Sequence, residues 1–310
     1  MILYRVMNPY RLKAYILLLI VAVIWGIAGP VIKLTLKGLP PDIFLLYRFF
    51  ISSITAIVIF IFTGIKFPKE PKLIRDILVY GFFNSIVTLG LLFWGMDKTS
   101  LLDMSLISLF GPILIILAGA VFLKDYVTVK EKVGITIAFI GSALLIIEPL
   151  LKNHNGKSGF GGNLLILASL LSSAFCAVIL KKLLRRNVSP SLLANIAFLL
   201  GFLVLLPFTM IKYGFVESFS IIKNAPFPYH LGVIYMAIFS GTIAYILSNI
   251  GQKTIELSEA ALFAYLNPIF SAIIAIAVLG DKLTTPVIIG SVTIFIGVII
   301  AEIKKRRVAS

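Results

Sequence analysis

The sequence predicts an all-α polytopic membrane protein, with ten transmembrane helices arranged as two inverted five-helix repeats. Composition, the length of the apolar runs and an internal duplication predict this class. Of the 310 residues, 60% are hydrophobic and 13% are charged, whereas a soluble domain carries about 25% charged residues. The apolar residues come in runs of roughly 20, which is long enough for a helix to cross a bilayer. The short alternating segments typical of β-barrels are missing from the sequence.

The internal duplication relates residues 101–142 to residues 257–298 by a shift of 156 positions without a gap. The pairs that coincide include Pro112 with Pro268, Asp125 with Asp281, Thr128 with Thr284, Gly134 with Gly290 and Gly141 with Gly297. Chance matching of apolar residues would not place proline, aspartate, threonine and glycine in one register. Internal symmetry of this kind is typical of transporter folds.

Ten apolar segments are expected to span the membrane. They cover residues 13–35, 41–63, 73–95, 101–123, 129–148, 161–181, 190–212, 230–252, 257–279 and 285–303. The polar, glycine-rich stretch LKNHNGKSGFGG over residues 151–162 is the expected seam between a first repeat, 1–150, and a second, 151–310. Because five is an odd number of spans, the second repeat enters the membrane from the opposite side and is inverted.

The distribution of positive charge predicts the orientation of the chain. With the N-terminus inside, inner segments hold 19 of the 28 lysines and arginines, outer segments hold eight, and Arg48 lies within a span. This bias places both termini in the cytoplasm and the protein in the cell (inner) membrane. The net charge of +15 then reflects cytoplasmic flanks that face anionic lipid. We therefore expect the bilayer and a small-molecule substrate as partners, and no nucleic acid. The first apolar run is too long for a signal peptide and is expected to be a retained helix.

No residue pattern indicates an enzyme, a cofactor or a metal site. The two histidines, His154 and His230, lie in or beside expected outer loops, and no His, Cys, Asp or Glu cluster has metal-ligand spacing. There is no Walker loop, so transport would use a gradient or facilitation and not ATP. The single cysteine, Cys176, is expected to be a small packing residue within a span.

Arg48 is the most informative charge because it lies about seven residues into its span. An arginine there is costly unless it faces a cavity, forms an ion pair or snorkels. Snorkelling over about 10 Å, at 1.5 Å per residue, is within the reach of arginine. Two roles stay open: structural snorkelling or pairing, and contact with a substrate carboxylate or phosphate.

Polar and aromatic residues near the middle of the spans are the candidates for a substrate cavity. They are Trp25, Arg48, Asn84, Thr88, Trp94, Tyr235, Tyr245, Ser248, Asn249, Tyr265 and Asn267. Asn84 and Thr88 share one helix face, as do Tyr245, Ser248 and Asn249. A cavity lining would use these faces, and hydrogen bonding between helices is the alternative.

Three prolines are expected in helix interiors, where each removes a backbone hydrogen bond. Pro30, Pro112 and Pro268 are therefore hinge candidates around a central site, with static kinks as the alternative. Gly134 and Gly141, and their counterparts in the second copy, are seven residues apart and suit close packing of helices.

Four residues are expected to be structural caps: Asp125, Thr128, Asp281 and Thr285. Thr128 and Glu131 have the spacing of a capping box, and Thr285 precedes a proline that suits the first helical position. The aspartates are expected beside helix N-termini, where negative charge is favourable. Proton coupling is the alternative role for both aspartates.

The ends of the two copies resemble the EamA-type transporters of the drug/metabolite transporter superfamily. The motifs are PILIILAGAVFLKD over residues 112–125 and PIFSAIIAIAVLGD over residues 268–281. Trp25-Gly26 and Arg48-Phe49 also resemble the family. The family usually has glutamate where this chain has aspartate at the end of each motif, which keeps the charge with a shorter reach.

The resemblance implies alternating access, with a central cavity lined chiefly by spans 1, 3, 4, 6, 8 and 9. It also implies export of amino acids, other small metabolites or drugs. We expect a secondary transporter that exports small metabolites, amino acids first. The alternatives are a transporter of drugs or of other metabolites, such as nucleosides or sugar derivatives, and a lipid-handling or scaffold protein without solute flux. The motifs do not specify the substrate, the direction, the coupling ion or the oligomeric state.

Overall fold

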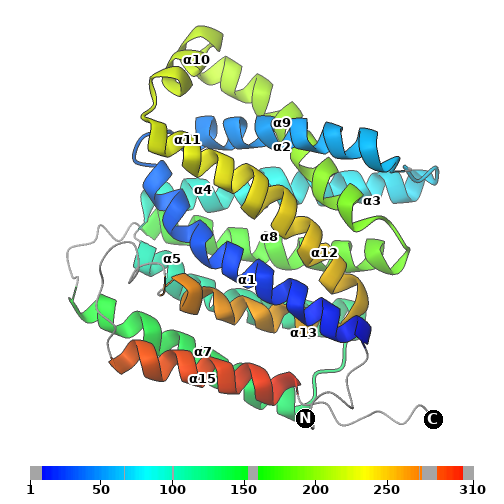
Figure 1. The fold of residues 1–310 in the computed structure, drawn as a ribbon, viewed down its shortest axis with the longest axis vertical. Coiled ribbons are helices and arrows are strands. Elements are labelled where there is room, and N and C mark those ends of the chain that lie inside the picture. The colour runs from blue at the N-terminus through cyan, green and yellow to red at the C-terminus, as the bar shows by residue number, and fades with distance from the viewer. Residues whose placement is uncertain are drawn as a thin grey trace.

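The computed structural model describes residues 9–65, 67–99, 101–152, 160–271, 273 and 285–302. Throughout these residues the regular elements are helical, and the long helices lie side by side across the view in Figure 1. The elements of the first half are α1 (Pro9–Thr35), α2 (Pro41–Thr63), α3 (Pro71–Phe82), the π-helix η2 (Phe83–Thr88), α4 (Leu89–Lys98), α5 (Leu101–Ser108), α6 (Phe110–Ala118), the π-helix η3 (Gly119–Leu123) and α7 (Val129–Lys152). The elements of the second half are α8 (Phe160–Arg185), α9 (Pro190–Tyr213), α10 (Phe215–Asn224), α11 (Phe227–Ile234), the π-helix η4 (Tyr235–Ile243), α12 (Ala244–Thr254), α13 (Leu257–Leu262), the 3₁₀-helix η5 (Phe263–Leu266) and α15 (Thr285–Glu302).

Within the described residues, seven helical segments are long and apolar enough to cross a membrane, which makes this a multi-pass membrane protein. They are Pro9–Thr35, Pro41–Thr63, Pro71–Lys98, Asp103–Leu123, Phe160–Arg185, Pro190–Tyr213 and Phe227–Thr254. Each agrees with an expected span to within four residues at either end. Three further expected spans coincide with α7, with α13 and η5, and with α15, although 257–279 is described only in part. The total of ten spans stays a prediction.

Prolines begin several of these helices, because the first turn needs no amide hydrogen from them. Pro41, Pro71 and Pro190 each occupy the first helical position. At the start of α9 the Ser189 hydroxyl also accepts the Leu192 amide at 3.4 Å, as an N-cap does.

Helices α7 and α15 pack against each other through glycines. A Cβ on Gly134 would lie 2.5 Å from the Gly297 carbonyl oxygen, and a Cβ on Gly141 would lie 2.8 Å from the Gly290 carbonyl oxygen. Because no side chain intervenes, the two backbones come into direct contact along antiparallel helices. The close packing expected from the glycine spacing is therefore present.

Three features were not expected from the sequence. Two π-helical segments, η2 and η4, interrupt the spans 71–98 and 227–254. The short helix α10 occupies a stretch expected to be a loop, and Figure 1 shows it beyond the end of α9. Its large apolar side chains, Phe215, Val216 and Phe219, are exposed.

The prolines expected in helix interiors differ in their surroundings. Pro30 lies inside the continuous helix α1. Pro112 lies in the first turn of α6, after a break between α5 and α6, and Pro268 follows the 3₁₀-helix η5. A local departure from the α-helix precedes both Pro112 and Pro268, as expected for prolines that remove a backbone hydrogen bond within a span. Their use as hinges stays a prediction. Pro207, inside α9, was not singled out.

The capping box at the start of α7 is present. The Thr128 amide donates to Glu131 Oε2 at 2.7 Å, and the Glu131 amide donates to Thr128 Oγ1 at 3.2 Å. Asp125 serves a different helix: its Oδ2 accepts the amide of Leu257, the first residue of α13, at 3.1 Å. Its Oδ1 pairs with Arg185 Nη2 at 3.0 Å. This aspartate thus links three segments of the fold.

The two remaining expected caps belong to the second copy. Asp281 lies outside the described residues. Helix α15 begins at Thr285 itself, and the position before it is also outside the described residues.

Candidate functional site

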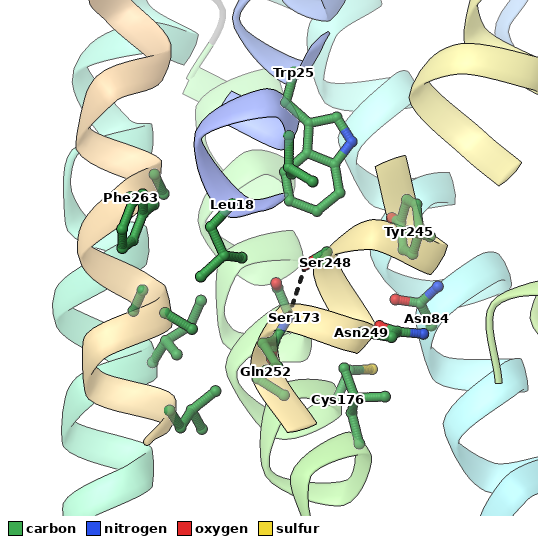
Figure 2. A pocket seen from close by; sticks show the side chains of 18 of the residues that line it. Leu18, Trp25, Asn84, Ser173, Cys176, Tyr245, Ser248, Asn249, Gln252 and Phe263 are labelled. Carbon is green, nitrogen blue, oxygen red and sulfur yellow. Dashed lines mark hydrogen bonds between the residues drawn. The ribbon is translucent and has the colours of Figure 1, made fainter. Parts of the chain in front are cut away.

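A cavity of about 160 Å³ lies between helices from both halves of the chain (Figure 2). Its walls come from α1, α3 with η2, α6, α8, α12, and α13 with η5. These elements correspond to expected spans 1, 3, 4, 6, 8 and 9, the set that the resemblance implies. The volume limits an occupant to a small molecule or a few waters.

The structure brings seven of the eleven cavity candidates to this one space. They are Trp25, Asn84, Thr88, Tyr245, Ser248, Asn249 and Asn267. Figure 2 shows Trp25, Asn84, Tyr245 and Asn249 converging from α1, η2 and α12. The residues chosen because they share helix faces therefore lie around one cavity. Their contact with a substrate stays a prediction.

The lining carries no formal charge among the described residues: it holds no Asp, Glu, Lys or Arg side chain. Much of it is apolar, with Leu18, Val21 and Phe263 among the contributors. The polar groups are hydroxyls and the side-chain amides of Asn84, Asn249, Gln252 and Asn267. Such a surface suits a solute without net charge, since a fixed unpaired charge on the solute would meet no counter-charge on the wall.

Of the four side-chain amides in the lining, Asn249 and Gln252 donate hydrogen bonds to protein groups, whereas Asn84 and Asn267 each have one atom without a partner among the described residues. Asn249 Nδ2 donates to the Pro190 carbonyl at 3.0 Å, and Gln252 Nε2 donates to Ser248 Oγ at 2.8 Å. In contrast, Asn84 Nδ2 and Asn267 Oδ1 are buried and have no hydrogen-bond partner. Buried polar atoms are nearly always satisfied in proteins. Among the described residues, Asn84 and Asn267 thus each keep one polar atom without a protein partner, on side chains that line the cavity.

The π-helix η4 supplies carbonyl groups that other side chains bind. Trp25 Nε1 donates to the Ser240 carbonyl at 3.1 Å, and Ser52 Oγ donates to the Ala237 carbonyl at 3.1 Å. The Trp25 ring also meets the Tyr245 ring edge-on at 5.4 Å between centroids. These contacts hold the indole at one end of the cavity, and π-helical turns are frequent at functional sites.

Three of the four candidates outside the lining are engaged elsewhere. Trp94 Nε1 donates to Asp42 Oδ1 at 2.5 Å, and the Tyr235 hydroxyl donates to the Ile24 carbonyl at 2.7 Å. Tyr265 is 1% exposed and packs in a hydrophobic cluster with α1, α7 and α15.

Arg48 is the fourth, and it is enclosed by protein. The residue is 1% exposed. Its Cζ atom lies 6.0 Å from the ring centroid of Phe49, 5.6 Å from that of Phe93 and 5.7 Å from that of Phe198. Within the described part of the chain it forms no ion pair, and its Nε and Nη1 atoms have no hydrogen-bond partner. In the described part of the chain its neighbours are aromatic rings, and both roles expected for Arg48, structural and substrate-binding, stay predictions.

The sequence model of the EamA-like transporter family matches the chain twice, over residues 12–147 and 160–302. The chain belongs to the EamA-like transporter family. A solved crystal structure shares its fold, with a TM-score of 0.72 at 15% identity over 93% of this chain and 96% of that one.

Named relatives of this EamA-like transporter cover nearly its whole length. The uncharacterized transporter YyaM of Bacillus subtilis is 28% identical over 94% of this chain and 94% of its own. A protein of Escherichia coli named probable amino-acid metabolite efflux pump is 24% identical over 93% of this chain and 94% of its own. A protein of Salmonella typhimurium with the same name is 25% identical over 92% of this chain and 93% of its own.

Helix α8 of this EamA-like transporter contributes lining residues that sequence reasoning did not select. Ser173 and Cys176 face the cavity in Figure 2. Cys176 Sγ lies 3.8 Å from Thr88 Oγ1, which in turn lies 2.7 Å from Ser172 Oγ. Small hydroxyl and thiol residues are ordinary in membrane helices, so the resemblance indicated span 6 as a lining helix without indicating which of its residues face the cavity.

A cluster of three carboxylates also escaped the sequence search. One oxygen each from Glu131, Glu256 and Glu259 lies within 4.8 Å of the others. Arg11 Nη2 pairs with Glu259 Oε2 at 2.7 Å, and the Tyr15 hydroxyl donates to the same oxygen at 3.3 Å. The cluster joins α1, α7 and the start of α13, and residues so distant in sequence show no spacing pattern.

Proposed function

We propose that this EamA-like transporter is a secondary transporter that exports small polar metabolites, amino acids first, by alternating access. The observation that carries the proposal is the neutral cavity with the unpaired amide atoms of Asn84 and Asn267. The carboxylate and ammonium of a zwitterion offset each other, so the molecule has no net charge to be balanced by the wall, and both groups can exchange hydrogen bonds with the hydroxyls and amides of the lining. The names of the two enterobacterial relatives support amino-acid metabolites as the first class to test.

The proposed architecture has ten spans in two inverted repeats, 1–150 and 151–310, with both termini in the cytoplasm. The double match of one family model supports two related halves. The α7–α15 contact supports inversion: Gly134 meets Gly297, and Gly141 meets Gly290. Because Gly134 corresponds to Gly290 and Gly141 to Gly297, the contacts are reciprocal, which is the pattern that a two-fold axis produces.

Uptake into proteoliposomes tests the function. We expect flux of at least one amino acid from a panel of the twenty standard ones, above that of protein-free vesicles. Asn84→Ala and Asn267→Ala should each reduce this flux, because each removes an unpaired polar atom from the cavity wall. Asn224→Ala is the matched control, since this amide is exposed on α10 away from the cavity. Folded protein that moves no panel member would refute the proposal, and lipid scrambling in the same vesicles would favour the lipid-handling alternative.

Cysteine labelling tests the topology. In a Cys176→Ser background, Asn224→Cys and Arg186→Cys place single thiols at exposed positions after and before the span Pro190–Tyr213. We expect a membrane-impermeant maleimide to label the thiol at position 224 on intact cells, and the thiol at position 186 only after permeabilisation. The reverse pattern would overturn the orientation, and labelling of both positions on intact cells would overturn the span count.

A further inference from the structure

Arg48 is a buried cation without an ion-pair partner among the described residues. Three aromatic rings surround the guanidinium at 5.6–6.0 Å and compensate its charge in part. The N–H groups at Nε and Nη1 still have no acceptor, although an arginine side chain has five donors to satisfy. A buried charge in a membrane helix is costly and is a mark of function when no structural partner is present.

One ring separates this cation from the cavity. The Phe198 ring, on α9, neighbours both groups: its centroid lies 5.7 Å from Arg48 Cζ and 5.2 Å from the centroid of the Tyr245 ring. Tyr245 lines the cavity and contacts the Trp25 ring, which also lines it. Phe198 is fully buried and is not part of the lining. Arg48 therefore lies one side-chain layer behind the wall.

We propose that Arg48 binds the carboxylate of the transported solute and that Phe198 is the ring that covers it in the state seen here. The inference rests on the proposed function and names the group that its substrates share. A guanidinium pairs with a carboxylate through two parallel hydrogen bonds, which would satisfy unpaired N–H groups. Arg48 carries one positive charge with no carboxylate paired to it in the described part of the chain, whereas Lys181 and Asp125 behind the same wall are already bound to protein groups. One guanidinium matches one negative charge, so a monocarboxylate is favoured over a dianionic phosphate ester.

The geometry assigns different ends of the solute to different residues. The carboxylate reaches Arg48 once the Phe198 ring turns away, while the polar remainder stays against Asn84 and Asn267. Phe198 then acts on specificity, because its ring controls access to the guanidinium of Arg48.

Acid and amide pairs measure the contribution of the carboxylate. The probes are L-threonine with L-threoninamide, L-leucine with L-leucinamide, and L-phenylalanine with L-phenylalaninamide, each tested for uptake into proteoliposomes. The wild-type protein should prefer the acid by about tenfold or more, since a site built to bind a polar group rejects the analogue without it. Arg48→Met should abolish this preference through KM, and Arg48→Lys should retain part of it. A merely structural role would lower acid and amide uptake equally.

Phe198→Ala tests the cover, and it keeps the proposal testable if Arg48→Met fails to fold. Removal of the ring should lower KM for the acids and leave the amides unchanged. Phe202→Ala is the matched control, because Phe202 lies one turn further along α9 and contacts Phe50 at 5.6 Å.

Three results would overturn the inference. If Arg48→Lys and Phe198→Ala both keep the wild-type ratio of acid to amide uptake, the inference about Arg48 is wrong, although the proposed transport function still stands. Preferential uptake of a phosphate ester such as O-phospho-L-serine would replace the carboxylate as the recognised group. Absence of flux for every probe with wild-type protein would remove the proposed function and this inference together.

Discussion

Lys33 and Lys181 make the same contact in the two halves of the protein. Lys33 Nζ donates to the carbonyls of Met96 and Thr99 at 2.6 and 2.7 Å, and Lys181 Nζ donates to those of Gln252 and Ile255. The accepting residues are related by 156 positions, the shift of the duplication. Each ammonium thereby satisfies carbonyls at the end of a helix, α4 or α12, that have no partner within it.

This contact predicts a stability effect. Lys181→Met should lower the free energy of unfolding by about 1–3 kcal/mol, because it leaves buried carbonyls without a donor. Lys33→Met should have a smaller effect, since Lys33 is only half-buried and water can replace the ammonium. Thermal unfolding of the detergent-solubilised protein measures both. Lys253→Met, at an exposed position of α12, is the control. Equal melting temperatures for Lys181→Met and the control would contradict the assigned role.

Much of the fold could be predicted because the bilayer fixes the length and polarity of each span. The expected and observed segments therefore agree closely, and the prolines that begin α2 and α9 lie at expected boundaries. The π-helices η2 and η4 could not be predicted, since one extra residue in a turn changes neither hydropathy nor length perceptibly. Helix α10 escaped prediction because it is short and its apolar residues are exposed.

The candidate site could be predicted only as far as residue type allows. Asn84 and Trp94 are both polar groups within one apolar segment, yet one lines the cavity and the other binds Asp42. The direction of a side chain depends on how its helix packs, and the sequence of one helix does not contain this information. The cost of a buried arginine was evident at Arg48, but the rings that enclose it come from α2, α4 and α9.

The α7–α15 contact predicts that added volume is harmful there. Gly297→Ala would place a Cβ 2.5 Å from the Ala138 backbone nitrogen, which cannot move without shifting α7. We expect a loss of about 1–3 kcal/mol of stability from this overpacking. Gly161→Ala is a matched control, because no atom lies within 4 Å of its would-be Cβ. A thermal melt of Gly297→Ala that coincides with the wild-type curve would show that the helices can separate freely.

Asp125 offers a test between a structural role and proton coupling. Asp125→Asn keeps an oxygen for the Leu257 amide but loses the ion pair with Arg185. Asp125→Ala loses both and should cost about 1–3 kcal/mol of stability, more than the asparagine variant. With a structural role, the transport of Asp125→Asn keeps its dependence on an imposed pH gradient. Loss of that dependence at normal stability would instead favour proton coupling through this carboxylate.

Asp42 joins three helices at one end of the bundle, and we expect this junction to keep the cavity closed on that side. Its carboxylate accepts hydrogen bonds from Trp94 Nε1 at 2.5 Å and Tyr213 OH at 3.2 Å, and it also pairs with Lys212. The aspartate side chain is 2% exposed, so removing it leaves those donors without their shared acceptor. Asp42→Ala should therefore shift the population toward a state in which the α2, α4 and α9 ends separate.

The single cysteine reports on this shift, because Cys176 lines the cavity. A membrane-impermeant thiol reagent added from outside should modify Cys176 several-fold faster in Asp42→Ala than in the wild-type protein. Asp76→Ala is the matched control, since Asp76 pairs with Arg75 on an exposed face of α3. An unchanged modification rate in Asp42→Ala would show that the junction stabilises the helices without controlling access. A faster rate with the reagent inside would assign the junction to the opposite side of the membrane, because separation of these helix ends opens the cavity only toward the side on which they lie.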